Sequence, residues 1–105
     1  MASSIVSVGG EKFSQGDFTL HQNTPNPISR MSASTTIRYR IPSRKEVVLK
    51  LYDVQGKLIR TLMNETKDAG EHSFTMDGKH LRSGTYFYEL TAGNFRDVKK
   101  MAVVR

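Results

Sequence analysis

Few side chains in this sequence are spaced for catalysis. The three histidines, His21, His72 and His80, show no metal-ligand spacing, and His72 falls on the apolar face of an expected strand. The chain has no Gly-x-Ser-x-Gly elbow, no His-Glu-x-x-His pair and no glycine-rich phosphate loop. We therefore interpret His72 as a structural histidine and expect no enzyme and no cofactor.

Three aspartates could in principle gather around a calcium ion. Asp53, Asp68 and Asp77 all lie at expected turns, but the ligand spacing of an EF-hand loop is absent. Aspartate commonly caps the backbone of a turn, which explains each position more economically. We predict no metal site.

Aromatic side chains could form a platform on which a sugar ring stacks. The candidates are Tyr39, Tyr52, Tyr86, Phe87 and Tyr88. The alternation around them places most in the core or in cross-strand pairs, and the chain has no Trp. Carbohydrate binding therefore stays as an alternative interpretation.

Size and charge limit the classes of function. The 105 residues include 16 Lys+Arg and 10 Asp+Glu, for a net charge of +6, and no Cys. A chain of this length is one small domain with little room for a deep active site. Its basic residues are scattered, with no run longer than two, which predicts solvated charge and no nucleic-acid partner.

Alternating apolar and polar residues predict about seven short strands. The clearest are residues 35–41, 47–52, 71–77 and 85–91, and shorter or less regular ones are expected at 18–20, 57–63 and 95–104. We expect a bulge in 57–63, because its apolar residues do not alternate cleanly. Periodicity does not tell which face of 95–104 points inward. The profile is that of an all-β, immunoglobulin-like β-sandwich of about seven antiparallel strands.

The two ends of the chain differ in character. Residues 1–16 have sparse apolar positions and several glycines, which predicts a linker before a domain spanning 17–105. The last strand is apolar and flanked by Lys99 and Lys100. Lysines protect an exposed edge strand from aggregation, and such an edge can also accept a strand from another protein through its unpaired backbone groups. The same edge could pair with a second copy.

Several segments together resemble a known family. They are Pro25-Asn26-Pro27, Thr35-Thr36-Ile37-Arg38-Tyr39, Tyr52-Asp53-Val54-Gln55-Gly56, Ala69-Gly70-Glu71-His72, Asp77-Gly78, Ser83-Gly84-Thr85-Tyr86 and Lys99-Lys100-Met101. In this order, and collinear from about Phe18 to Arg105, they resemble the type A C-terminal sorting domain of the type IX secretion system. The chain departs from the family pattern at Thr24, where Tyr is usual, in the longer segment 28–33, and at Met76, where Trp is frequent.

The resemblance implies a non-catalytic sorting and translocation signal for an upstream cargo protein. Its implied partners are the outer-membrane translocon, a cysteine-peptidase sortase and the covalently linked cargo. Its implied route runs through the periplasm to the cell surface or the medium. We expect recognition at Lys99, Lys100, Met101, Val103, Val104 and Arg105.

Other residues of these motifs are expected to shape the fold. Pro25, Asn26 and Pro27 should form a rigid, extended turn at the domain entrance, because proline fixes φ and restrains its predecessor. The remaining structural positions are Tyr52, Asp53, Gly56, Gly70, Gly78, Gly84 and Tyr86.

Two other functions remain open. An immunoglobulin-like sandwich can be a carbohydrate-binding or spacer module of a secreted hydrolase. The chain is also similar to the immunoglobulin-like domain of flagellar hook-scaffolding proteins around Tyr52-Asp53 and Ser83-Gly84. The Lys99-Lys100-Met101 strand and Pro25-Asn26-Pro27 argue against that second similarity.

Overall fold

The computed structural model describes residues 18–29 and 32–105, and the linker expected at 1–16 lies outside them. The described residues form strands and turns, with no helix. The strands are β1 (Thr19–Leu20), β2 (Ser34–Ile41), β3 (Lys45–Asp53), β4 (Leu58–Lys67), β5 (Gly70–Asp77), β6 (Gly84–Ala92) and β7 (Phe95–Val103). The predicted all-β class and the number of strands are confirmed.

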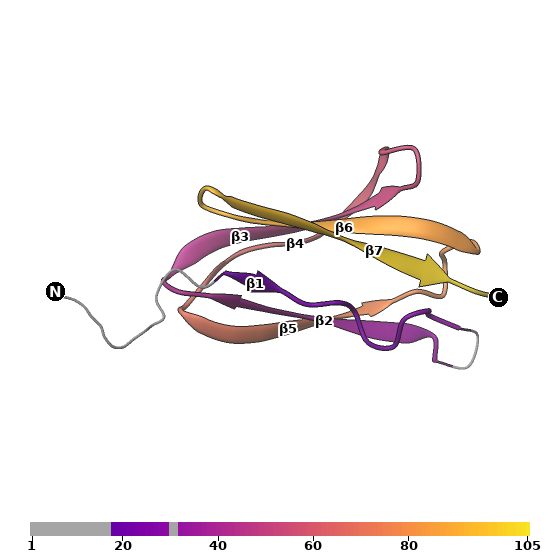
Figure 1. Cartoon of the computed structure of the whole chain (residues 1–105), viewed down its shortest axis with the longest axis horizontal. Helices are drawn as coiled ribbons and strands as arrows, with labels where there is room; N and C mark the ends of the chain where they lie inside the picture. Colours follow the sequence, from indigo (N-terminus) through magenta and orange to yellow (C-terminus); the bar gives the residue numbers. More distant parts are fainter. Residues whose placement is uncertain (1–17, 30–31) are drawn as a thin grey trace, which may run out of the picture.

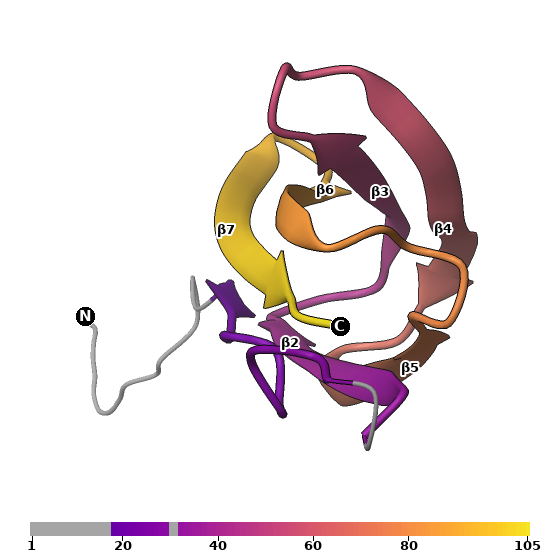
Figure 2. The same cartoon turned by 90° about the vertical axis from the view of Figure 1, so that its right-hand side faces the viewer.

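The strands form two antiparallel sheets. Sheet A has the order β1-β2-β5, and sheet B has the order β4-β3-β6-β7. Figures 1 and 2 show sheet B curving over sheet A, so that the two sheets enclose one core. Side chains alternate along a strand, so each sheet turns one apolar face inward. This is the predicted β-sandwich.

The core is filled by the inward residues of both sheets. In β2, Ile37, Tyr39 and Ile41 are buried, while Arg38 and Arg40 between them are exposed. The other buried apolar residues come mainly from β3, β6 and β7. Each fully buried apolar side chain of this size contributes roughly 1.5–3 kcal/mol of transfer free energy, so the core dominates the stability of the domain.

His72 completes the inner side of sheet A next to Tyr39. The two rings stack with centroids 5.4 Å apart, and His72 Nε2 lies 2.7 Å from the carbonyl oxygen of Asp68, to which it donates. The side chain therefore packs and bonds within the fold. This agrees with its interpretation as a structural histidine.

Strand β4 is irregular, as its mixed periodicity predicted. Its register with β3 shifts twice. Leu62 has no partner between the pairs Leu49–Met63 and Lys50–Thr61, and Ile59 has none between Leu51–Arg60 and Tyr52–Leu58. A bulge leaves one residue unpaired and changes the face on which the next side chains lie. The two bulges explain why neither a period of two nor a helical period fits residues 58–63.

Strand β7 is paired to β6 along its whole length, from Phe95 to Val103. Its odd positions point inward, since Met101 and Val103 are buried and Val98 and Lys100 are exposed. Phe18, before β1, stacks on Phe95 with ring centroids 4.6 Å apart, which places the entrance of the domain beside the start of β7.

Candidate functional site

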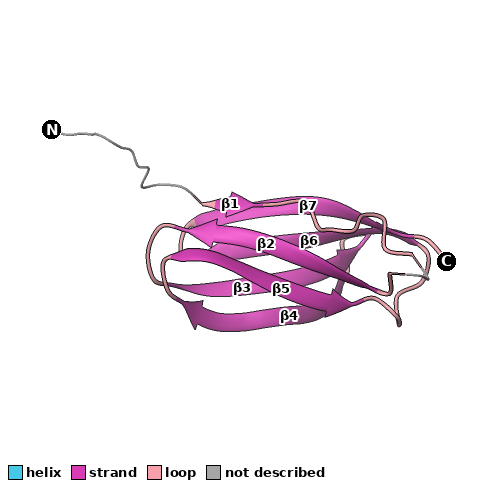
Figure 3. Cartoon of the chain, turned by 90° about the horizontal axis from the view of Figure 1, so that it is seen from below, coloured by secondary structure: helices cyan, strands magenta, loops and turns pink. Residues whose placement is uncertain are grey.

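The outer edge of β7 is covered by residues 21–28, which we call the strap. Figure 3 shows this segment beside β7 after it leaves β1. Gln22 Nε2 donates to the carbonyl oxygen of Lys100 at 2.6 Å, and the Ala102 N–H donates to Asn26 Oδ1 at 3.0 Å. Ile28 pairs with β7 as a short parallel bridge: its N–H donates to the Ala102 oxygen at 2.9 Å, and its oxygen accepts from the Val104 N–H at 2.8 Å.

The strap also contacts β2 of the other sheet. The Thr24 N–H donates to the Thr36 oxygen at 2.9 Å, and the Thr36 N–H donates to the Thr24 oxygen at 2.8 Å. At the start of the strap, the His21 N–H donates to the Arg38 oxygen at 2.9 Å. The strap therefore bonds to both sheets and closes one lateral side of the sandwich.

A buried polar contact holds the middle of the strap. Asn23 is 2% exposed, and its Nδ2 donates to the Pro25 oxygen at 3.1 Å and to Thr35 Oγ1 at 3.0 Å. Thr35 Oγ1 donates in turn to the Pro25 oxygen at 2.9 Å. Buried polar groups are costly unless they are paired, so these bonds fix the backbone around Pro25.

The Pro25-Asn26-Pro27 segment stands within this strap. Its backbone bends at 25–27, and the Thr24–Pro25 and Asn26–Pro27 peptide bonds are both cis. The expectation of an extended turn is therefore wrong. The segment does not lie at the entrance marked by Phe18 and Phe95, because the Asn26 side chain bonds Ala102 near the other end of β7.

Tyr88, on the inward face of β6, bonds to the start of the strap. Its hydroxyl donates to the carbonyl oxygen of His21 at 2.7 Å, and the residue is fully buried. Burial raises the pKa of Tyr88 to about 12, because the phenolate would lose its hydration.

Arg105 is held by the loop between β5 and β6. Its guanidinium donates to the Leu81 oxygen, at 3.1 Å from Nε and 2.8 Å from Nη2, and to the Gly78 oxygen. Its backbone N–H donates to Ser83 Oγ at 3.1 Å. The side chain predicted for recognition is thus also a structural link between the end of β7 and this loop.

The six residues predicted for recognition fall into different environments. Met101 and Val103 are in the core, and Lys99 is half-buried. Lys100 is exposed, and Val104 is 52% exposed. Only some of these side chains can therefore meet a partner while the domain stays folded.

The prediction of an unpaired backbone edge on β7 is wrong for the Lys100 oxygen, for both backbone groups of Ala102 and for the Val104 N–H, which the strap bonds. Besides the strap contacts, the Val98 N–H donates to Asp97 Oδ1 at 2.9 Å. No local pattern indicates these contacts, because Gln22 and Ile28 are more than 70 positions away from the residues of β7 that they bond.

The residues predicted to shape the fold mostly lie at turns. Asp53 Oδ1 accepts the N–H groups of Gln55 and Lys57, both at 2.9 Å, and Gly56 has φ +85°, which closes the expected tight turn. Tyr86 donates to the Arg82 oxygen at 2.7 Å. Gly70 and Gly84 begin β5 and β6.

Gly78 packs against the strap. A Cβ atom placed there would lie 3.2 Å from Cδ1 and 3.3 Å from Cγ2 of Ile28. The Gly78 N–H donates to the Ala33 oxygen at 2.9 Å. Close packing against Ile28, rather than an unusual φ, therefore favours glycine at this position.

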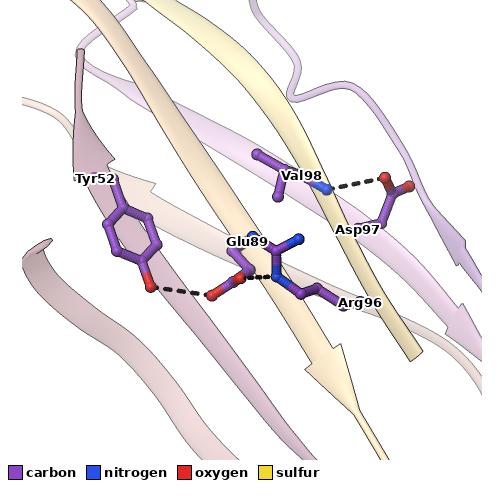
Figure 4. Close-up of polar contacts among 5 residues, drawn as sticks. All are labelled: Tyr52, Glu89, Arg96, Asp97 and Val98. Carbon is purple, nitrogen blue, oxygen red and sulfur yellow. Dashed lines mark hydrogen bonds and ion pairs between the residues drawn. The ribbon is translucent and has the colours of Figure 1, made fainter. Parts of the chain in front are cut away.

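A polar cluster lies on the outer face of sheet B (Figure 4). Tyr52 donates to Glu89 Oε1 at 3.0 Å, and Arg96 pairs with Glu89 Oε2. Burial, together with the bond to Glu89, raises the pKa of Tyr52. Phe87 is the register partner of Tyr52, and with Val98 these residues line a shallow hollow of about 290 Å³. Both carboxylate oxygens of Glu89 are engaged within the protein.

The aromatic residues considered for a sugar platform are divided between core and surface. Tyr39, Tyr86 and Tyr88 are buried. Only Tyr52 and Phe87 lie on the outer face of sheet B, and both are half-buried. The prediction that most of these rings belong to the core or to cross-strand pairs is confirmed.

Residues 18–29 and 32–105 contain neither a metal-binding cluster nor a membrane-spanning helix. No group of three or more His, Asp or Glu in this part of the chain is arranged to hold a metal ion. The same residues include no helix long and apolar enough to cross a membrane.

Comparison with known proteins identifies the class to which this sandwich belongs. The family model of the secretion system C-terminal sorting domain matches residues 24–104, from the strap to the end of β7. The chain belongs to this family, which is the type IX sorting domain that its motifs resemble. Membership implies involvement with type IX secretion and export to the cell surface or beyond.

A solved structure shares the fold. It is that of PorZ, described as an essential bacterial surface component of the type-IX secretion system of Porphyromonas gingivalis. The match has a TM-score of 0.55 and 18% sequence identity, and it covers 84% of this chain and 11% of that one. The chain thus corresponds to a small part of the length of PorZ. None of the curated proteins compared matches the chain.

Proposed function

We propose that this domain is a non-catalytic sorting signal that directs a covalently linked upstream cargo protein across the outer membrane through the type IX translocon. The cargo passes through the periplasm and reaches the cell surface or the medium, where a cysteine-peptidase sortase is the second partner. The observation that carries the proposal is the family match over residues 24–104, since this segment contains residues 24–28 of the strap and all of β7.

The arrangement of the strap and β7 supports an address role. The strap and the end of β7 stand at the two ends of the matched segment, yet they are hydrogen-bonded to each other. A partner can therefore meet residues from both ends of the domain on one surface. No cofactor or metal is needed for such a role.

A secretion assay tests the proposal. Residues 1–105 are fused behind a signal peptide and a fluorescent protein, in a bacterium with an intact type IX system and in a translocon-deficient strain. We expect fluorescence at the surface or in the medium of the first strain only. Retention of a folded fusion in the periplasm of both strains would contradict the proposal and favour a binding or spacer module.

Truncation is a poor test of recognition in this fold. Deleting residues 99–105 would remove Met101 and Val103 from the core, so a loss of export could reflect unfolding. Substitution of exposed residues such as Lys100 separates recognition from stability.

A further inference from the structure

We propose that the export machinery recognises the strap and β7 together in their closed form, in which the strap is hydrogen-bonded to β7. The machinery contributes an acidic surface and does not add a strand to β7. This inference rests on the proposed function and specifies its partner. We call the surface concerned the joint face. It is formed by Val98, Lys100 and Val104 of the β7 segment and by Gln22 and Asn26 of the strap.

The strap already occupies the outer edge of β7 from the Lys100 oxygen to the Val104 N–H. A partner strand would need the Lys100 oxygen, the N–H and oxygen of Ala102 and the Val104 N–H, all of which the strap now bonds. Opening the strap would break four hydrogen bonds to β7 and expose Ile28, which is fully buried. Strand addition would return hydrogen bonds of the same kind, and the burial of Ile28 would still be lost. The closed form is therefore the one presented to a partner.

The closed form displays a net positive charge along β7 and the residues that follow it. Residues 95–105 contain four cations, Arg96, Lys99, Lys100 and Arg105, against Asp97, a net charge of +3. Arg96 is paired with Glu89, and Arg105 donates to the carbonyl oxygens of Gly78 and Leu81. Within the described part of the chain, no ion pair involves Lys100, whose side chain is exposed.

Lys100 has apolar neighbours on its own face. Val98, two residues earlier, is 37% exposed, and Val104 is 52% exposed. An interface that combines a central charge with apolar contacts is matched by carboxylates opposite the lysine and apolar groups on either side. The chemistry that fits the joint face is therefore an acidic protein surface with apolar flanks.

The other side of the sandwich offers the competing surface. In the described residues, β4 pairs only with β3 and β5 only with β2, so both strands have a free outer edge. Between them lies a groove of about 210 Å³ lined in part by Leu62, Phe74 and Met76. Recognition at this groove would be insensitive to changes on the joint face, which makes it a clear alternative outcome.

A disulfide lock tests whether the strap stays closed. Ile28→Cys with Val103→Cys places two thiols at bridge partners of a chain that has no other cysteine. The fusion carries a cysteine-free fluorescent protein, and the single variants are the controls for lost core packing. We expect the exported double variant to contain the disulfide, measured by thiol labelling. Export of the single variants with retention of the disulfide-bonded form would overturn the proposal.

A charge reversal tests the acidic partner independently of the lock. Lys100→Glu should lower the exported fraction about tenfold, because it places like charges at the interface, and Lys100→Arg should restore export. Lys57→Glu, in the exposed β3–β4 turn, is the matched control with the same change in net charge. Normal export of Lys100→Glu would overturn the joint face and leave the β4–β5 groove as the better surface.

The wild-type fusion, assayed in both strains, distinguishes failure of the proposed function from failure of the joint face alone. If its export does not depend on the translocon, the proposed function and the joint face fail together. If it does, and the lock or the charge reversal gives the contrary result, only the joint face fails.

Discussion

The backbone N–H of Ala102 donates to the side-chain oxygen of Asn26 at 3.0 Å, across 76 positions of sequence. The bond connects the Pro25-Asn26-Pro27 segment to the last strand of the sandwich. Two motifs that look independent in the sequence are thus parts of one surface. Because β7 is the last strand in the chain, this surface can form only after the whole domain has been synthesised.

Replacing Asn26 should loosen the strap without unfolding the core. Asn26→Ala removes the acceptor of the Ala102 N–H, and we expect a loss of about 1 kcal/mol in the free energy of unfolding. Amide hydrogen exchange at Ala102 should accelerate, since its N–H would face solvent. Asn26→Asp keeps the acceptor oxygen and is the control; exchange at Ala102 that is equally slow in the alanine variant would show that the bond does not hold the strap.

Gly56 tests backbone strain in isolation. Its φ is +85°, and no atom lies within 4 Å of the position that a Cβ would take. Gly56→Ala should therefore cost about 1–2 kcal/mol through conformation alone, and Gly56→Asn should cost less, because Asn tolerates positive φ. Urea unfolding of the three proteins measures this order. Equal stability of the alanine and wild-type proteins would mean that the turn relaxes.

Gly78 tests packing against the strap. Gly78→Ala should destabilise the domain by about 1–3 kcal/mol, because the new methyl group would crowd Cδ1 of Ile28. Ile28→Val removes that atom, so the two changes together should cost less than the sum of the single changes. A double-mutant cycle in urea measures the coupling. Strict additivity would place the strain of Gly78→Ala elsewhere.

Tyr88 should make the domain sensitive to alkaline pH. Its pKa is about 12 in the folded protein and 10 in the unfolded reference, so the folded state holds the proton more tightly. The contribution of Tyr88 to stability is therefore complete below pH 10 and is lost as the pH rises from 10 towards 12. Tyr88→Phe should weaken this fall and should remove the latest transition in a phenolate absorbance titration. An unchanged slope above pH 10 would assign the sensitivity to another group.

The regular strands could be predicted from the sequence because their pattern is local. In β2, buried Ile37 and Tyr39 alternate with exposed Arg38 and Arg40. The polarity of each residue therefore predicts the face of the sheet on which its side chain lies. The turn at Asp53 was also predictable, because the Asp53 carboxylate accepts backbone N–H groups no more than four residues away.

The strap could not be predicted in the same way. Asn23 and Gln22 look like ordinary loop residues, and only the folded chain shows that Asn23 is buried and that Gln22 reaches Lys100. The face of β7 was also ambiguous, because apolar residues occupy both its odd and its even positions. Contacts between segments distant in sequence determine the position of the strap and the inward face of β7. A local sequence pattern cannot predict such contacts.

Under the proposed function, the stacking of Phe18 on Phe95 determines where an upstream cargo is attached to the sandwich. It fixes the entrance of the domain at the start of β7, whereas Arg105 follows the end of that strand. Nine residues at about 3.3 Å each make β7 roughly 30 Å long. The sandwich therefore acts as a spacer about one domain length long. It separates the chain that precedes Phe18 from a partner bound at Arg105.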